Sequence, residues 1–101
     1  MEELENIIFE LIVYAGNGKS SAMEAIQEAK KGEFEKADQS LKDASVELGK
    51  AHKYQTSLIQ AEAAGKATTI TLLLIHAQDH FMSAMTVIDL ATEIVEIYKT
   101  R

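Results

Sequence analysis

Cysteine, proline and tryptophan are all absent from this chain of 101 residues. Without cysteine the protein can form neither a disulfide nor a zinc site built on thiolates. Without proline, and with alanine, glutamate, lysine, leucine and isoleucine dominant, the composition favours long helices over strands. The length is that of one domain, so we expect residues 1–101 to form a single folding unit.

Basic charge and long apolar runs are also scarce. The chain has 10 lysines and arginines against 16 acidic residues, which gives a net charge of −6. This balance argues against a nucleic-acid partner, because phosphate binding needs a basic face, and it suits docking onto a partner with a basic patch. No run approaches the roughly 20 apolar residues of a membrane span, and the first residues are acidic where a signal peptide is basic. We therefore expect a soluble protein without membrane insertion, located by default in the cytoplasm.

Glycines divide the sequence. Gly32 follows two lysines and Gly65 follows two alanines, and each fits the left-handed position just past the end of a helix. Thr68 or Thr69 is then placed to cap the next helix. The pattern predicts three helices of similar length, each roughly 45 Å long, over residues 2–31, 33–64 and 69–99.

Within each predicted helix, apolar residues alternate at spacings of three and four. The seams are Leu4, Ile8, Leu11, Ala15, Ala22, Ala25 and Ala29; Phe34, Ala37, Leu41, Ala44, Leu48, Ala51 and Leu58, with Gln55 in one slot; and Leu74, Ala77, Phe81, Ala84, Ile88, Ala91, Val95 and Tyr98. Such seams predict an all-α, antiparallel three-helix bundle. The segment Gly16-Asn17-Gly18 interrupts the first helix and leaves open a kink, a bulge or a break.

The third predicted helix carries more apolar surface than a three-helix bundle covers. A second stripe runs beside its seam, and it consists of Leu72, His76, Asp79, His80, Ser83, Val87, Leu90, Ile94 and Ile97. The first helix similarly adds Ile7, Phe9, Ile12, Val13 and Tyr14 to its own seam. Soluble monomers rarely expose stripes of this kind, so the sequence predicts self-association, with the polar cluster at or beside the interface.

That polar cluster, His76-Ala77-Gln78-Asp79-His80, is the main candidate site. On a helix His76, Asp79 and His80 share one face. One interpretation is a metal-hydrolase helix, but such a site needs a third ligand, and His52 is the only other histidine. Another is a set of interface polar residues that satisfy one another. An alternative from a different functional class is a non-catalytic helical interaction module with a His/Asp site for a transition metal. His52 itself is expected to be structural.

A second candidate, Gly18-Lys19-Ser20, has the ending of a phosphate-binding loop. The full motif needs another glycine at position 13, which is valine here, and a preceding strand that this composition does not predict. We therefore interpret the segment as an irregular stretch of helix.

Four segments of the chain form a familiar set. They are Ala15-Gly16-Asn17-Gly18-Lys19-Ser20-Ser21, Gly32-Glu33-Phe34, Ala51-His52-Lys53-Tyr54-Gln55-Thr56 and Leu73 to Met85, which contains the histidine cluster. Together they resemble the lactose/cellobiose-type enzyme IIA proteins of the bacterial phosphoenolpyruvate-dependent sugar phosphotransferase system. They occur in order and span nearly the whole chain. The resemblance implies a subunit of a homotrimer with nine helices in all.

The resemblance also implies a function. His76 is expected to accept a phosphoryl group from the phosphohistidine of the carrier protein HPr and to pass it to a cysteine of the cognate enzyme IIB. Gln78 and His80 are expected to orient the phosphoryl oxygens, with an adjacent subunit contributing, although Gln78 projects away from the stripe. Asp79 is expected near the threefold axis, where it shares a divalent metal, commonly Mg²⁺, with its symmetry mates. Alanine after His76 favours cellobiose, chitobiose or lichenan-derived sugars.

Overall fold

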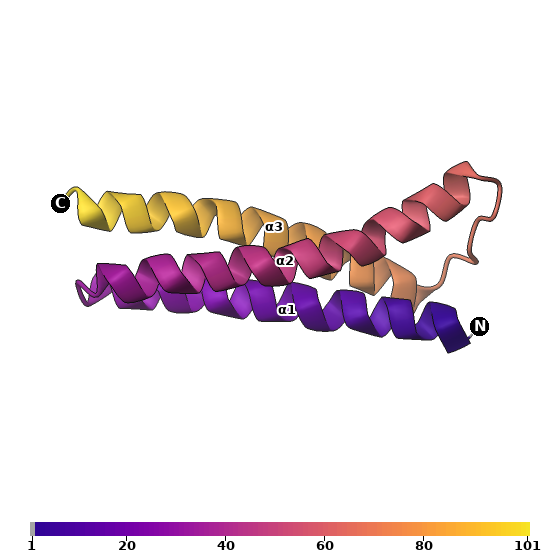
Figure 1. Ribbon diagram of the computed structural model, residues 1–101, viewed down its shortest axis with the longest axis horizontal. Coiled ribbons are helices and arrows are strands. Elements are labelled where there is room, and N and C mark those ends of the chain that lie inside the picture. The colour runs from indigo at the N-terminus through magenta and orange to yellow at the C-terminus, as the bar shows by residue number, and fades with distance from the viewer. Residues whose placement is uncertain (1) are drawn as a thin grey trace.

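The computed structural model describes residues 2–101, and these form three helices, α1 (Glu2–Lys30), α2 (Phe34–Ala63) and α3 (Leu72–Lys99). The bundle is elongated, with extents of 51 × 21 × 19 Å. As Figure 1 shows, α2 runs antiparallel to α1 and α3, and the chain termini lie at opposite ends of the bundle. The predicted all-α class and the antiparallel three-helix subunit are thereby confirmed.

Both helix ends predicted from glycine are confirmed. Gly32 has φ of 77° and Gly65 has φ of 82°, in the left-handed region that glycine adopts without strain. After α1, the N–H of Gly32 bonds to the carbonyl of Ala29 at 3.0 Å and the N–H of Glu33 bonds to that of Glu28 at 2.9 Å. The same pair of hydrogen bonds closes α2 around Gly65. These Schellman motifs satisfy carbonyls that the end of a helix leaves without partners.

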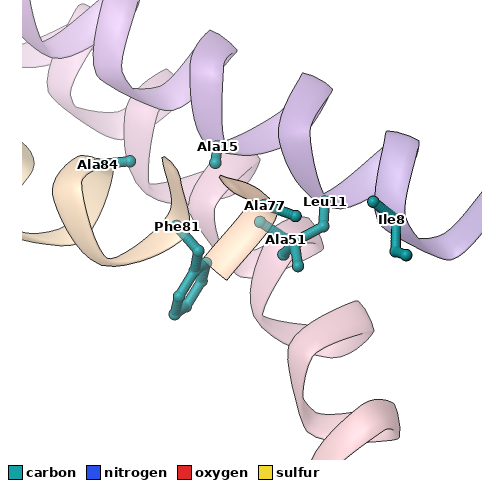
Figure 2. Packing of buried hydrophobic residues seen from close by; sticks show 7 residues of the cluster. All are labelled: Ile8, Leu11, Ala15, Ala51, Ala77, Phe81 and Ala84. Carbon is teal, nitrogen blue, oxygen red and sulfur yellow. The ribbon is translucent and has the colours of Figure 1, made fainter. Parts of the chain in front are cut away.

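The seams predicted from spacing form the core. In α1 and α3 nearly every seam residue is buried, and the largest fully buried side chains are Phe81, Leu11 and Val95. Figure 2 shows Leu11 of α1 pointing toward Ala77 of α3 and Ala51 of α2, where small alanines leave room for the larger side chains. In α2 only the alanines at 37, 44 and 51 are fully buried, and its larger seam residues are half-buried. Alanine on this helix therefore sets a close spacing between the helices.

The segment Gly16-Asn17-Gly18 neither breaks nor bends out of α1, which is continuous from Glu2 to Lys30. Gly18 lies on the same face of α1 as the seam residues Ala15 and Ala22, between the two, and it is buried. A Cβ atom added there would lie 3.2 Å from the carbonyl oxygen of Ala44 and 3.3 Å from Cδ1 of Ile88. The glycine thus permits the close packing of all three helices at this level. This placement also agrees with the interpretation of Gly18-Lys19-Ser20 as helix.

The second half of α2 diverges from α3. Figure 1 shows the C-terminal turns of α2 rising away from the other two helices before the chain returns through residues 64–71. At the opposite end of the bundle the two helices are joined by Lys99, whose Nζ lies 2.7 Å from Oδ1 of Asp38. This hydrogen bond to Asp38 raises the pKa of Lys99 above its ordinary value. The open end of the bundle therefore lies at the start of α3, beside the candidate site.

Candidate functional site

The candidate site lies in the first three turns of α3, and Thr71 fixes where that helix begins. Its side-chain oxygen accepts a hydrogen bond from the backbone N–H of Leu74 at 3.1 Å, which satisfies one of the unpaired donors of the first turn. The prediction of Thr68 or Thr69 as the cap was wrong, since both precede the helix. Ile70, which follows them, is 74% exposed, so no buried apolar contact holds that segment in helical form.

His76 and His80 lie side by side on α3. Their ring centroids are 4.5 Å apart and the ring planes meet at 83°, so the edge of one ring faces the plane of the other. His76 is exposed and His80 is half-buried. Between and beside them Ala77 and Phe81 are completely buried, which anchors this part of the helix in the core. A group attached to the ring of His76 would therefore lie within reach of His80 and remain open to an approaching protein.

Asp79 is also exposed, on the outer side of α3 away from the core. Among residues 2–101 no group of three or more histidine, aspartate or glutamate side chains is placed to hold a metal ion. The third ligand that the metal-hydrolase interpretation requires is therefore not supplied by the described part of one chain. A site that draws one carboxylate from each of three subunits is a different arrangement, which Asp79 fits as an exposed oxygen donor of the kind Mg²⁺ binds.

Gln78 projects from the other side of α3 and contacts α2. Its Oε1 accepts a hydrogen bond from Nε2 of Gln55 at 3.1 Å, and both side chains are half-buried. The sequence analysis noted Gln55 only as a polar residue in an apolar seam. That irregularity was the available signal, but it did not reveal the partner, because the contact joins residues 23 positions apart across two helices.

A cavity of about 300 Å³ lies next to this pair, at the end of the bundle where α2 and α3 diverge. Its walls are mainly apolar side chains, and they are completed by Gln78, Glu62 and Thr68. Leu58 and Ile59 contribute from α2, and Leu74 and Ile75 contribute from α3. The amide of Gln78 therefore lies at a polar edge of an apolar hollow.

His52 flanks the α2 seam, at the place that the sequence predicts. Its ring stacks on that of Phe81 with centroids 5.9 Å apart, while the residue as a whole is exposed. Its imidazole thus covers the edge of the core on the α2 side of Phe81.

The apolar stripe of α3 is exposed in the single chain. Leu72, Leu90 and Ile97 are 83%, 58% and 58% exposed, and Phe9 and Val13 of α1 are each about half exposed. Val87 and Ile94 of the same stripe are half-buried. Several large exposed apolar side chains on one helix are unusual on an isolated soluble subunit. No helix among the described residues is long and apolar enough to cross a membrane.

The sequence family described as "PTS system, Lactose/Cellobiose specific IIA subunit" matches residues 6–99. This chain belongs to that family. The resemblance seen in the four sequence segments is thus confirmed. Among its relatives, the lichenan-specific phosphotransferase enzyme IIA component of Bacillus subtilis is 60% identical over 98 residues, which cover 97% of this chain and 89% of the relative.

Solved structures agree with this assignment to the IIA family. The crystal structure of the cellobiose-specific enzyme IIA from Bacillus anthracis has a TM-score of 0.96 and 49% identity, and the match covers 99% of this chain and 92% of that one. The IIA(chitobiose)–HPr complex of Escherichia coli contains a chain with a TM-score of 0.84 and 35% identity, with coverage of 99% and 97%. The chain is therefore a IIA component of the sugar phosphotransferase system by both sequence and fold.

Proposed function

We propose that this IIA subunit carries a phosphoryl group on His76, which it accepts from phospho-HPr and delivers to a cysteine of the cognate enzyme IIB. The observation that carries the proposal is the exposed ring of His76, paired with His80 at 4.5 Å on a helix whose neighbouring residues are locked in the core. Support for the donor comes from the homologous IIA(chitobiose) protein, which has been solved in complex with HPr. A reaction between these components would take place in the cytoplasm, which is the location that we propose.

Each transfer exchanges one bond to phosphorus for another. In the first step a neutral ring nitrogen of His76 attacks the phosphorus held by HPr, and the P–N bond of the HPr phosphohistidine breaks. In the second step a cysteine thiolate of enzyme IIB attacks the same phosphorus, and the P–N bond to His76 breaks. Histidine suits the carrier role because its ordinary pKa of about 6.5 leaves the imidazole neutral and nucleophilic near pH 7. The transition state is loose, so the protein mainly positions groups and balances charge.

His80 is positioned to act on a phosphoryl group within the same subunit. It lies one helical turn from His76 with its ring edge-on, and partial burial restricts its motion. An N–H of its imidazole can then donate to a phosphoryl oxygen, and such a charge-assisted hydrogen bond is stronger than a neutral one.

Gln78 reaches the phosphoryl group only from another subunit. On α3 the side chains of His76 and Gln78 point about 200° apart, because successive residues turn by about 100°. If Asp79 faces a threefold axis, His76 lies on one side of that axis and Gln78 on the other. In a closed ring of identical subunits one side of each α3 faces the opposite side of the next. The amide of Gln78 in one subunit is thereby brought toward His76 of its neighbour.

A homotrimer of three-helix subunits accounts for the exposed stripe of α3, which would become the shared core of the assembly. Three Asp79 carboxylates would converge at its axis and repel one another unless a cation intervenes. We propose that they bind a single Mg²⁺, whose charge would offset that repulsion. The names of the relatives, which include lichenan-, cellobiose- and chitobiose-specific components, favour a β-linked oligosaccharide as the sugar that is finally phosphorylated.

The decisive experiment is incubation of the protein with phosphoenolpyruvate, enzyme I and HPr. We expect one acid-labile phosphate per chain, which is lost on addition of enzyme IIB. His76→Ala should take up none, whereas His52→Ala, a matched change at another exposed histidine, should take up a full equivalent. Full labelling of His76→Ala would refute the assignment of the carrier residue. Tight zinc binding together with no phosphate uptake by the natural chain would favour the metal-binding interaction module.

A further inference from the structure

Gln55 is a polar residue at a position where the α2 seam is otherwise apolar. The seam spacing continues from Leu48 and Ala51 through Gln55 to Leu58, so an apolar side chain would extend the core here. A half-buried amide gives up apolar contact and must find a hydrogen-bond partner. Its partner is Gln78, at 3.1 Å, on the segment of α3 that carries His76.

In the structure the hydrogen bond from Gln55 engages the oxygen end of the Gln78 amide and leaves its NH₂ end free. A side-chain amide has one acceptor oxygen and one NH₂ group with two donors. Because Gln55 donates to Oε1, that oxygen is engaged with α2, and none of the hydrogen bonds formed by residues 2–101 uses Nε2 of Gln78. The two N–H donors are therefore turned away from Gln55. An ionised phosphoryl group presents only acceptor oxygens, so this is the orientation that can bind it.

We infer that Gln55 is a positioning residue for phosphoryl transfer, because its NH₂ group satisfies Oε1 of Gln78 when the donors of that amide face the phosphoryl group. The role rests on the proposed function of His76 and Gln78. Gln55 itself makes no contact with the reacting atoms. Reversal of the amide would direct Oε1 at the phosphoryl oxygens and replace an attraction with a repulsion.

Two substitutions of Gln55 separate positioning from packing. Gln55→Met keeps the length of the side chain and removes the donor, so the Gln78 amide becomes free to rotate. Gln55→Glu supplies only acceptors and draws Nε2 of Gln78 inward, which turns Oε1 outward. Ile59→Glu is the control for added charge, because it places a carboxylate one turn further along the same side of α2, at a residue that is 57% exposed.

The assay is single-turnover transfer from ³²P-labelled phospho-HPr at saturating donor concentration, with circular dichroism to verify folding. We expect Gln55→Met to slow transfer by about 3-fold and Gln55→Glu by about 10-fold or more, the second being the loss of a hydrogen bond to a charged group. Ile59→Glu should slow it by less than about 2-fold, since exposed charges are screened. In a Gln78→Met background, Gln55→Met should have no further effect and Gln55→Glu no more effect than Ile59→Glu.

Equal rates for Gln55→Met and Gln55→Glu would overturn the inference. So would a Gln55→Glu defect that Ile59→Glu reproduces or that persists undiminished in the Gln78→Met background. These failures differ from failure of the proposed function, in which the natural chain takes up no phosphate on His76 at all. If His76 is labelled normally while the Gln55 variants transfer at the natural rate, only the positioning role is lost.

Discussion

Replacement of Gly18 by alanine tests whether the helices pack as closely as the structure indicates. Two opposing effects act at this position. Alanine is better than glycine inside a helix by about 1 kcal/mol, which would stabilise α1. The new methyl group, however, would lie 3.2 Å from the carbonyl oxygen of Ala44 and 3.3 Å from Cδ1 of Ile88. The methyl of Ile88 can rotate, but the oxygen belongs to the hydrogen-bonded backbone of α2 and can move only with that helix.

Overpacking of this kind costs about 1–3 kcal/mol. The net change for Gly18→Ala is therefore expected to lie between no effect and a destabilisation of about 2 kcal/mol. Gly49 offers a matched control within α2, because a Cβ atom there would have no heavy atom within 4 Å. Gly49→Ala should gain only the stabilisation that comes from helix propensity. The difference in unfolding free energy between the two variants therefore isolates the cost of overpacking at Gly18.

Urea denaturation followed by circular dichroism measures both free energies of unfolding. All samples must be at one protein concentration, because the stability of an oligomer depends on concentration. We expect the natural slope of free energy against urea in both variants, with a lower midpoint for Gly18→Ala than for Gly49→Ala. If Gly18→Ala stabilised the protein as much as Gly49→Ala, the close approach of the three helices at this level would be wrong.

Three further predictions concern assembly and pH. Leu90→Glu should convert the proposed trimer to monomers in analytical ultracentrifugation. Val46→Glu, at a residue of nearly equal exposure on α2, should leave the trimer intact. If both variants dissociated, or neither did, the result would contradict an interface on α3. Asp79→Leu should fold and sediment as a trimer without metal, since three leucines do not repel, and its dissociation would count against an axial carboxylate cluster. Because the pKa of Lys99 is raised by Asp38, its ion pair is fully stabilising below the unfolded pKa of about 10.5 and is lost as pH rises through the higher folded value. Urea titrations should therefore show that the unfolding free energy of Lys99→Met falls less than that of the natural chain between about pH 10 and 12. If the two unfolding free energies fell equally over this range, the ion pair would contribute nothing to stability.

The relation between His76 and His80 could be predicted before the fold was known. Four residues on a helix return to the same side, so the contact between the two rings depends only on local helix geometry. The ends of α1 and α2 could be predicted from an equally local signal, because the left-handed backbone at Gly32 and Gly65 favours glycine. The start of α3 was less secure, since Thr68, Thr69 and Thr71 are all chemically able to cap a helix.

The amino-acid sequence by itself determined three helices, their buried seams and the face that carries His76, because each of these follows from spacing along one helix. The tertiary structure alone decided that α2 and α3 pack closely against Gly18 and that Gln55 contacts Gln78 where α2 diverges from α3. Both contacts depend on the relative rotation, spacing and splay of helices that are distant in sequence. These quantities are set by the packing of all the side chains together, and no local pattern encodes them.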